Sequence, residues 1–277
     1  MINLKSFPEE LMPVYRKAVA KKQDAALRSR LIDIIPKIEK CYKSYKENFD
    51  GNSLHAVVSD PVGQNNKADL EKLYSYKSMV IREVREKIRD VQLNIINNTC
   101  QNCTISSVNS MDHVLPFSSF PEFCVNPINL FPSCTECNSI KNAYVAEHGD
   151  YNFLNLYLDQ LPEKQYLFPN IKKDMDGDFI VEFTIDNRNG LAAPLYNLIS
   201  KHYEALDLFN RMRLNTVDTI RNIQIQISTR KANLALDKIK DEIIKTADEN
   251  RKFLGFNHFK HLTEIALVEN EDFMASF

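Results

Sequence analysis

Residues 100–142 read CQNCTISSVNSMDHVLPFSSFPEFCVNPINLFPSCTECNSIKN. Two Cys-x-x-Cys pairs lie in this stretch, with 30 residues between them: Cys100 with Cys103, and Cys134 with Cys137. Each pair can supply two thiolate ligands from one tight turn, and two such turns complete the tetrahedral set that zinc prefers. The spacing therefore predicts a structural zinc site. Because a closed four-cysteine site has no open position, any chemistry must come from the residues that it holds in place.

The rest of the composition favours metal binding over disulfides. The chain has 277 residues, six cysteines, and 35 Lys+Arg against 37 Asp+Glu. The charged first twenty residues leave no apolar core, so no signal peptide is expected, and no apolar run is long enough to span a membrane. We therefore expect a cytoplasmic protein, where reduced Cys-x-x-Cys pairs usually bind metal. Cys41 and Cys124 fall outside the spacing and are expected to be small buried side chains.

Three polar positions stand between or after the cysteine pairs. Asp112 precedes His113, and Asn138 directly follows the last cysteine. A carboxylate and an amide oxygen are ligands for a hard cation such as Mg²⁺, and histidine is the side chain that most readily exchanges a proton near neutral pH. The pattern predicts a cation site beside a general base.

These residues resemble the HNH endonucleases, which use a zinc-bound ββα-metal fold. The resemblance covers about residues 100–145 and rests on Asp-His-x-x-Pro, then Asn-Leu, then Cys-x-x-Cys-Asn-x-x-Lys. It implies hydrolysis of phosphodiester bonds in nucleic acid, with DNA as the default substrate and RNA, including tRNA, as the alternative. The longer string that includes Pro121-Glu122-Phe123 is similar to HNH effectors of Septu-type and retron-associated anti-phage systems. Those effectors work beside an SMC- or ABC-like ATPase, and some with a retron reverse transcriptase and its nucleic acid.

The resemblance also implies a role for each matching residue. Asp112 and Asn138 would hold the catalytic Mg²⁺ or Mn²⁺, and His113 would be the general base. Asn129 would tie the hairpin loop and steady the histidine. Two neighbours receive weaker assignments, Asn142 as a further metal ligand and Lys141 as a nucleic-acid contact. The last family position is Asn138 here, where other members have His, which bears on metal preference.

Two rival functions fit parts of the same stretch. A zinc deaminase needs His-x-Glu upstream of its Pro-x-Cys-x-x-Cys, but Leu115 stands two residues after His113, so this function is rejected. A non-catalytic, zinc-stabilised adaptor that binds nucleic acid or a partner stays open. The intact Asp112, His113 and Asn138 argue against it.

Hydrophobic periodicity predicts a mainly α-helical chain with a short β-hairpin. The resemblance to HNH endonucleases adds a small zinc-bound ββα-metal module. Three regions are expected: 1–94, helical; 95–150, the nuclease module; and 151–277, a hairpin followed by helices. In the first region a loop is expected over 50–66 and a helix over about 67–94. The hairpin is expected to join 166–168 to 179–185 across Asp176-Gly177. The histidines at 55, 202, 258 and 261 show no partner spacing and are expected to be surface or satisfied structural residues.

Charge is divided unevenly along the chain. Residues 1–100 hold 18 basic and 13 acidic side chains, whereas residues 101–150 hold 1 and 5. Because neutralisation of phosphates provides most non-specific affinity, the acidic middle segment should bind nucleic acid weakly by itself. A partner or the basic first region is expected to deliver the substrate. The basic run from Arg16 to Arg30 is expected to be a solvated face, with a face that contacts phosphate or a partner as the alternative. The chain also lacks a GxxxxGK[ST] or GxGxxG loop, so any ATP chemistry must come from another subunit.

Overall fold

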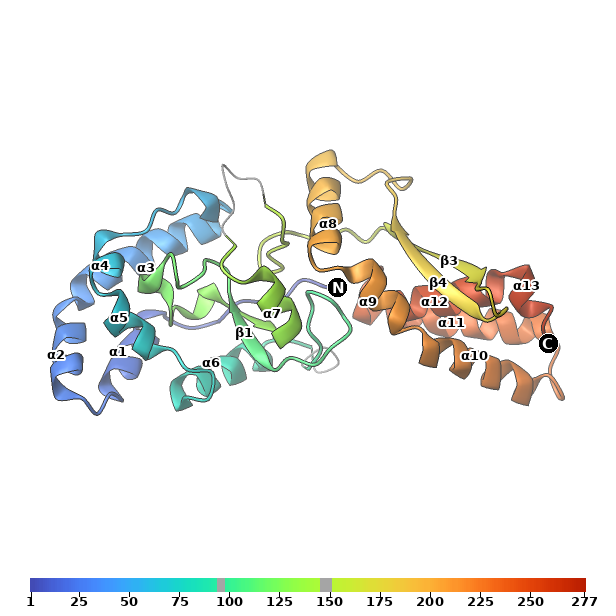
Figure 1. Ribbon diagram of the computed structural model, residues 1–277, viewed down its shortest axis with the longest axis horizontal. Helices are drawn as coiled ribbons and strands as arrows, with labels where there is room; N and C mark the ends of the chain where they lie inside the picture. The colour runs from blue at the N-terminus through green and yellow to red at the C-terminus, as the bar shows by residue number, and fades with distance from the viewer. Residues whose placement is uncertain (94–97, 145–150) are drawn as a thin grey trace. The chain divides into compact units, whose positions relative to one another are not determined.

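The computed structural model describes residues 1–93, 98–144 and 151–277 (Figure 1). Contacts divide the chain into two compact units. The N-terminal unit holds 3–102 and 106–160, and the C-terminal unit holds 161–277 with the short pieces 1–2 and 103–105. The expectation of a mainly helical chain is confirmed. The region boundaries expected after residues 94 and 150 fall outside the described residues.

Most helices of the N-terminal unit are short, and α3 (Ile35–Asp50) is the longest that it contains among the described residues. The helices are α1 (Met12–Ala20), α2 (Ala25–Asp33), α3, α4 (Pro61–Asn65), α5 (Lys67–Leu70), α6 (Met79–Asp90) and α7 (Thr135–Lys141), with 3-10 turns at Leu54–Ala56, Glu71–Leu73, Pro121–Phe123 and Pro127–Asn129. The expected loop over 50–66 is wrong in part, because Asp60 caps α4 by accepting a hydrogen bond from the Val62 N–H. The expected single helix over 67–94 is also wrong. The chain is extended at Tyr74, and Ser78 caps the new helix α6 through Ile81 N.

The hairpin that carries Asp112 and His113 packs on the N-terminal helices through its own connecting loop. Strands β1 (Ser110–His113) and β2 (Leu130–Ser133) pair antiparallel, with Asp112 opposite Phe131. From the loop between them, the Phe123 ring packs edge-on against Tyr45 of α3, with the ring centroids 4.8 Å apart. Both rings are fully or almost fully buried, so α3 anchors the hairpin loop in the core.

A buried carboxylate fastens the same loop to the segment before α4. Glu122 is completely buried, and its Oε1 accepts a hydrogen bond from Asp60 N at 2.8 Å. Gly63 lies so close to this carboxylate that a side chain at position 63 would collide with it. Residues 60–63 therefore hold the hairpin loop through the buried Glu122 carboxylate.

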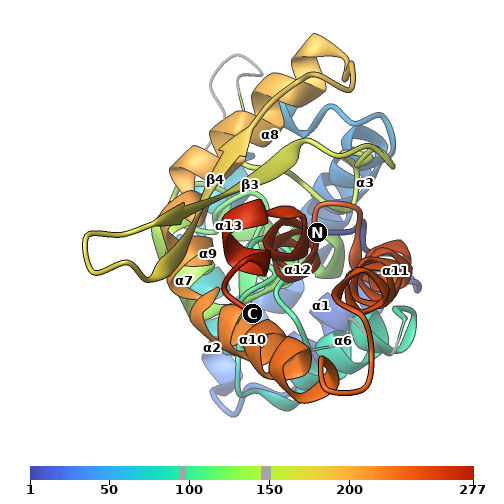
Figure 2. The same cartoon turned by 90° about the vertical axis from the view of Figure 1, so that its right-hand side faces the viewer.

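The C-terminal unit is a β-hairpin covered by helices (Figure 2). Its elements are β3 (Leu167–Lys173), β4 (Phe179–Ile185), α8 (Ala193–Ala205), α9 (Leu208–Leu214), α10 (Val217–Arg230), α11 (Leu236–Leu254), α12 (Phe259–Glu269) and α13 (Glu271–Met274). The expected hairpin is confirmed, although its first strand extends to Lys173. Gly177, in the turn, has a φ of +86° that favours glycine. Helix α12 contacts β3, α10 and α11 and forms the centre of this unit. No helix among the described residues is long and apolar enough to cross a bilayer.

Candidate metal centre and adjoining polar cleft

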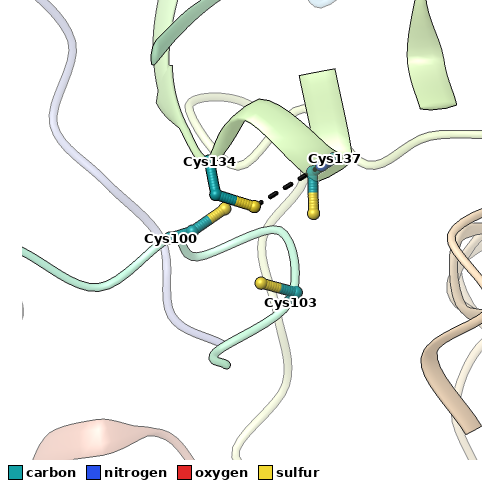
Figure 3. A group of neighbouring side chains, drawn as sticks. All are labelled: Cys100, Cys103, Cys134 and Cys137. Carbon is teal, nitrogen blue, oxygen red and sulfur yellow. Dashed lines mark hydrogen bonds between the residues drawn. The ribbon is translucent and has the colours of Figure 1, made fainter. Parts of the chain in front are cut away.

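Four cysteine sulfurs from the two Cys-x-x-Cys pairs point toward one another (Figure 3). The Sγ atoms of Cys100, Cys103, Cys134 and Cys137 all lie within 4.8 Å of one another, and all four residues are buried. Zinc–sulfur bonds of about 2.3 Å in a tetrahedron place sulfurs about 3.8 Å apart, so a small inward movement would close the set on an ion. The cluster is therefore compatible with zinc.

Local backbone geometry presents these sulfurs. Cys134 is the N-cap of α7, and its Sγ accepts a hydrogen bond from Cys137 N at 3.4 Å. In the other pair, Cys103 Sγ accepts a hydrogen bond from Ile105 N at 3.4 Å, across Thr104 with its φ of +57°. N–H donors aimed at sulfur favour the thiolate form, which is the form that binds metal.

Ser133, the last residue of β2, joins the cluster to the hairpin. Its Oγ lies 3.8 Å from Cys100 Sγ and accepts a hydrogen bond from Asn102 Nδ2 at 3.3 Å. The serine is completely buried. Sequence reasoning missed this residue, because a serine one position before a Cys-x-x-Cys pair carries no spacing signal of its own.

The hairpin and α7 form the walls of a cleft of about 440 Å³. Helix α7 packs on β1, and the two lie side by side in Figure 1. Four of the residues predicted for the site line this one cleft: Asp112, His113, Asn138 and Asn142. Strand β1 carries Asp112 and His113, and α7, which follows β2, brings Asn138 and Asn142 beside them.

His113 is held in one tautomer by its surroundings. Its Nε2 lies 2.9 Å from the carbonyl oxygen of Cys124. Because a carbonyl can only accept, Nε2 carries the proton, and in the neutral ring Nδ1 keeps its lone pair. The ring packs edge-on against Tyr74 at 4.6 Å and Phe117 at 5.0 Å between centroids. Burial lowers the pKa of His113 to about 4, so the imidazole is neutral at pH 7.

Asp112 is a buried carboxylate with a cation against it. Its side chain is 6% exposed, and Oδ1 accepts a hydrogen bond from Lys141 Nζ at 3.0 Å. The same ammonium group donates to the His113 carbonyl oxygen at 2.6 Å. Burial raises the pKa of Asp112, and the Lys141 charge acts in the opposite direction. Lys141 was expected to contact nucleic acid. In the structure its ammonium group lies against the Asp112 carboxylate.

Asn138 turns its amide nitrogen toward β1. Nδ2 donates to Ser110 Oγ at 2.8 Å and, at 3.4 Å, to the Met111 carbonyl oxygen. The amide oxygen is then the atom of this side chain that can serve as a metal ligand. Asn142 ends α7 with a φ of +47°, is exposed, and lines the same cleft.

Asn129 is completely buried and ties together the loop between β1 and β2. Its Oδ1 accepts hydrogen bonds from Tyr45 Oη at 2.9 Å and Leu115 N at 2.7 Å. Its Nδ2 donates to the carbonyl oxygens of Leu115 and Phe123, at 2.9 and 3.2 Å. It reaches His113 through the backbone, since Phe123 directly precedes the Cys124 carbonyl that binds the imidazole.

Cys41 and Cys124 are buried outside the cluster, as expected. Burial raises the pKa of both thiols to about 12, so neither is a thiolate at neutral pH. The Cys124 thiol donates to the Leu70 carbonyl oxygen at 3.1 Å.

The chain is similar to Protein ea31 of Escherichia phage lambda. The two are 25% identical over 230 residues, which cover 76% of this chain and 75% of that protein. No protein-family model matches the chain. No solved structure matches it either.

Proposed function

We propose that this protein is a metal-dependent endonuclease of the HNH type, which hydrolyses phosphodiester bonds in nucleic acid. The observation that carries the proposal is the environment of His113. One ring nitrogen is occupied by a backbone carbonyl, and the neutral ring lines one cleft with the Asp112 carboxylate and the Asn138 amide. A base with a free lone pair beside two hard ligands is the arrangement that metal-assisted hydrolysis requires.

The residues of the cleft divide the chemistry between them. His113 Nδ1 accepts a proton from the attacking water, and the Nε2 hydrogen bond to Cys124 keeps the ring oriented and stabilises the imidazolium that forms. Asp112 and Asn138 would hold Mg²⁺ or Mn²⁺, with Asn142 as a further ligand. A bound divalent ion would neutralise charge on the scissile phosphate and on the leaving oxygen.

Lys141 has a defined part in this arrangement. A buried carboxylate without a nearby cation is costly, and the Lys141 ammonium at 3.0 Å supplies one. A divalent ion held by Asp112 would compete with this ammonium group for the carboxylate. The hydrogen bonds of Lys141 to the backbone carbonyl oxygens of His113 and Val114 would keep the ammonium group beside the cleft with or without the ion.

The four-cysteine cluster would hold a structural Zn²⁺ with no open position. Because Cys134 caps α7 and Asn138 lies one turn further along, the ion would fix the helix that carries a catalytic ligand. The resemblance to Septu-type and retron-associated HNH effectors supports a place in a bacterial anti-phage complex beside an SMC- or ABC-like ATPase. DNA is the proposed substrate, with RNA, including tRNA, as the alternative.

The test is cleavage of plasmid DNA and of total RNA by the purified protein with Mg²⁺, alone and with the products of neighbouring genes. His113→Ala should lower the cleavage rate by about 100-fold or more, because a general base alone contributes about 10²–10⁴-fold. Asp112→Asn should also lower the rate, because it removes a charged ligand of the catalytic ion. His55→Ala, an exposed histidine of the same unit, is the control. Retained zinc content and an unchanged circular dichroism spectrum show that each variant is folded.

Two outcomes would contradict the proposal. One is cleavage at the wild-type rate by a zinc-loaded His113→Ala protein. The other is binding of nucleic acid without cleavage of either substrate, with or without the partner subunits, which would identify a zinc-stabilised adaptor.

A further inference from the structure

A second cleft, of about 220 Å³, adjoins the polar cleft. Three arginines of α6 line it: Arg82, Arg85 and Arg89. Tyr76 and Met111 line both clefts, so the two share a wall. All of these residues belong to the N-terminal unit. The arginines and the residues Asp112 and His113 therefore line neighbouring clefts.

The spacing of the arginines places them on one face of the helix. Positions 82, 85 and 89 are three and then four residues apart, which aligns side chains along an α-helix. The Arg85 guanidinium lies over the Tyr76 ring, 4.0 Å from its centroid. Arg82 and Arg89 are exposed.

Few acidic groups neutralise this face. Within the described part of the chain no carboxylate lies in salt-bridge range of Arg82 or Arg85, and Arg89 is 3.4 Å from its exposed neighbour Asp90. Glu86 is the acidic residue in the lining of this cleft. The other acid of this helix that could oppose the arginines, Glu83, is 2.5 Å from Lys17 of α1. Arg82 and Arg85 are therefore the arginines of this cleft with no carboxylate in salt-bridge range among the described residues, whereas Arg89 is partly neutralised by Asp90.

The basic run from Arg16 to Arg30 is used differently. Arg30 binds Asp69 at 2.6 Å, Lys17 binds Glu83, and Arg16 lies 3.5 Å from Glu39. These ion pairs bind α1 and α2 to their neighbours and involve three of the six basic side chains between Arg16 and Arg30. Among the basic residues of the first region, the arginines of α6 are the ones that line a cleft beside the polar site.

We propose that the cleft formed by Arg82, Arg85 and Arg89 is a polynucleotide-backbone subsite, which holds the phosphates of a DNA strand beside the polar cleft. The inference rests on the proposed nuclease function and adds the surface that delivers the substrate. Guanidinium groups bind phosphate oxygens in bidentate pairs, and each neutralised phosphate releases counterions. The subsite supplies the positive charge that the acidic segment 101–150 lacks.

The test uses a His113→Ala background, in which binding is measured without cleavage. Arg82→Gln/Arg89→Gln is compared with Lys40→Gln/Lys43→Gln, which removes the same charge from exposed positions of α3 that line neither cleft. The probe is a fluorescent duplex DNA, and its anisotropy is followed between 50 and 200 mM salt, a range over which phosphate contacts dominate affinity. We expect the arginine variant to bind about tenfold or more weakly. Its slope of log K against log salt should be shallower by about 1.8, and the control should keep the parent slope.

With the catalytic residues restored, the arginine variant should raise KM for DNA cleavage more than it lowers kcat. An unchanged salt slope, or an equal loss in the α3 control, would overturn the subsite. A fall in kcat alone would overturn it as well. These measurements are separate from the His113→Ala cleavage assay, so failure of the subsite leaves the proposed function standing. If the nuclease assay fails, the slope of log K against log salt still shows whether the arginines bind DNA phosphates.

Discussion

His113 and Asn129 show how single side chains in the hairpin depend on residues that are distant in the sequence. The imidazole orientation comes from Cys124, eleven residues later, and from Tyr74, which belongs to another element. Asn129 makes four hydrogen bonds, one with Tyr45 of α3 and three with the backbone of the loop at Leu115 and Phe123. The motif identified both residues, but the tautomer of one and the partners of the other depend on the fold.

The pH profile of cleavage should reflect the lowered pKa of His113. A base with a pKa of about 4 is already unprotonated at pH 5.5, so the rate should show no acid limb near 6.5. Single-turnover cleavage between pH 5.5 and 8 measures this. A rate that falls tenfold per pH unit below 6.5, with zinc still bound, would contradict the role or the environment assigned to His113.

Asn129→Ala should lower the free energy of unfolding by about 3 kcal/mol, because it leaves several buried polar groups without partners. Tyr45→Phe is the matched control. It removes one hydroxyl from the same network while Leu115 N still binds Asn129, so it should cost about 1 kcal/mol. Urea unfolding of the three proteins compares the costs. Equal losses would show that the amide is not the centre of the network.

Among the secondary-structure elements, the hairpin β1–β2 and the helix α7 do most to build the candidate site. Strand β1 carries both Asp112 and His113, and the short helix α7 brings Asn138 beside them. Periodicity could not define these elements, because four-residue strands and a seven-residue helix are too short for a pattern to emerge. The same limit explains why the loop expected over 50–66 and the single helix expected over 67–94 were wrong. In each segment a capping residue, Asp60 or Ser78, begins a helix whose start hydrophobic spacing alone does not mark.

Cys134→Ser should both empty the metal centre and loosen the start of α7. The protein should contain less than one equivalent of zinc by elemental analysis and should melt at a lower temperature, because metal binding is part of the folding free energy. Cys41→Ser changes a buried thiol outside the cluster and should keep the full zinc content. If the wild-type protein contains no zinc, or if Cys134→Ser retains it, the four-cysteine centre is not a zinc site.

At the scale of the whole molecule, the two compact units carry different features. The polar cleft and the arginine cleft lie in the N-terminal unit. The C-terminal unit contains a buried histidine that sequence reasoning expected to be exposed or satisfied. His258 is 8% exposed, and its Nδ1 has no hydrogen-bond partner among the described residues. Burial lowers its pKa from 6.5 to about 2.

This histidine should make the protein less stable in acid. Below pH 6.5 the unfolded chain takes up a proton at His258 while the folded chain does not, so stability is full above 6.5 and falls as the pH decreases. Between pH 7 and pH 5 the loss should be about 2 kcal/mol. His258→Phe should remove that part of the dependence, and His55→Ala should not. Denaturant unfolding at the two pH values measures both. Identical pH dependence in the wild type and His258→Phe would contradict the prediction.

The amino-acid sequence by itself determined the four-cysteine cluster, the candidate residues Asp112, His113 and Asn138, the mainly helical composition and the second hairpin. These features depend on spacing within short segments, and a spacing can be read directly from the chain. Only the tertiary structure decided the tautomer of His113, the ion pair between Lys141 and Asp112, and the cleft of α6 arginines that shares Tyr76 with the polar site. Desolvation, hydrogen-bond partners and the pairing of charges arise between residues far apart in the sequence, and no local pattern records them.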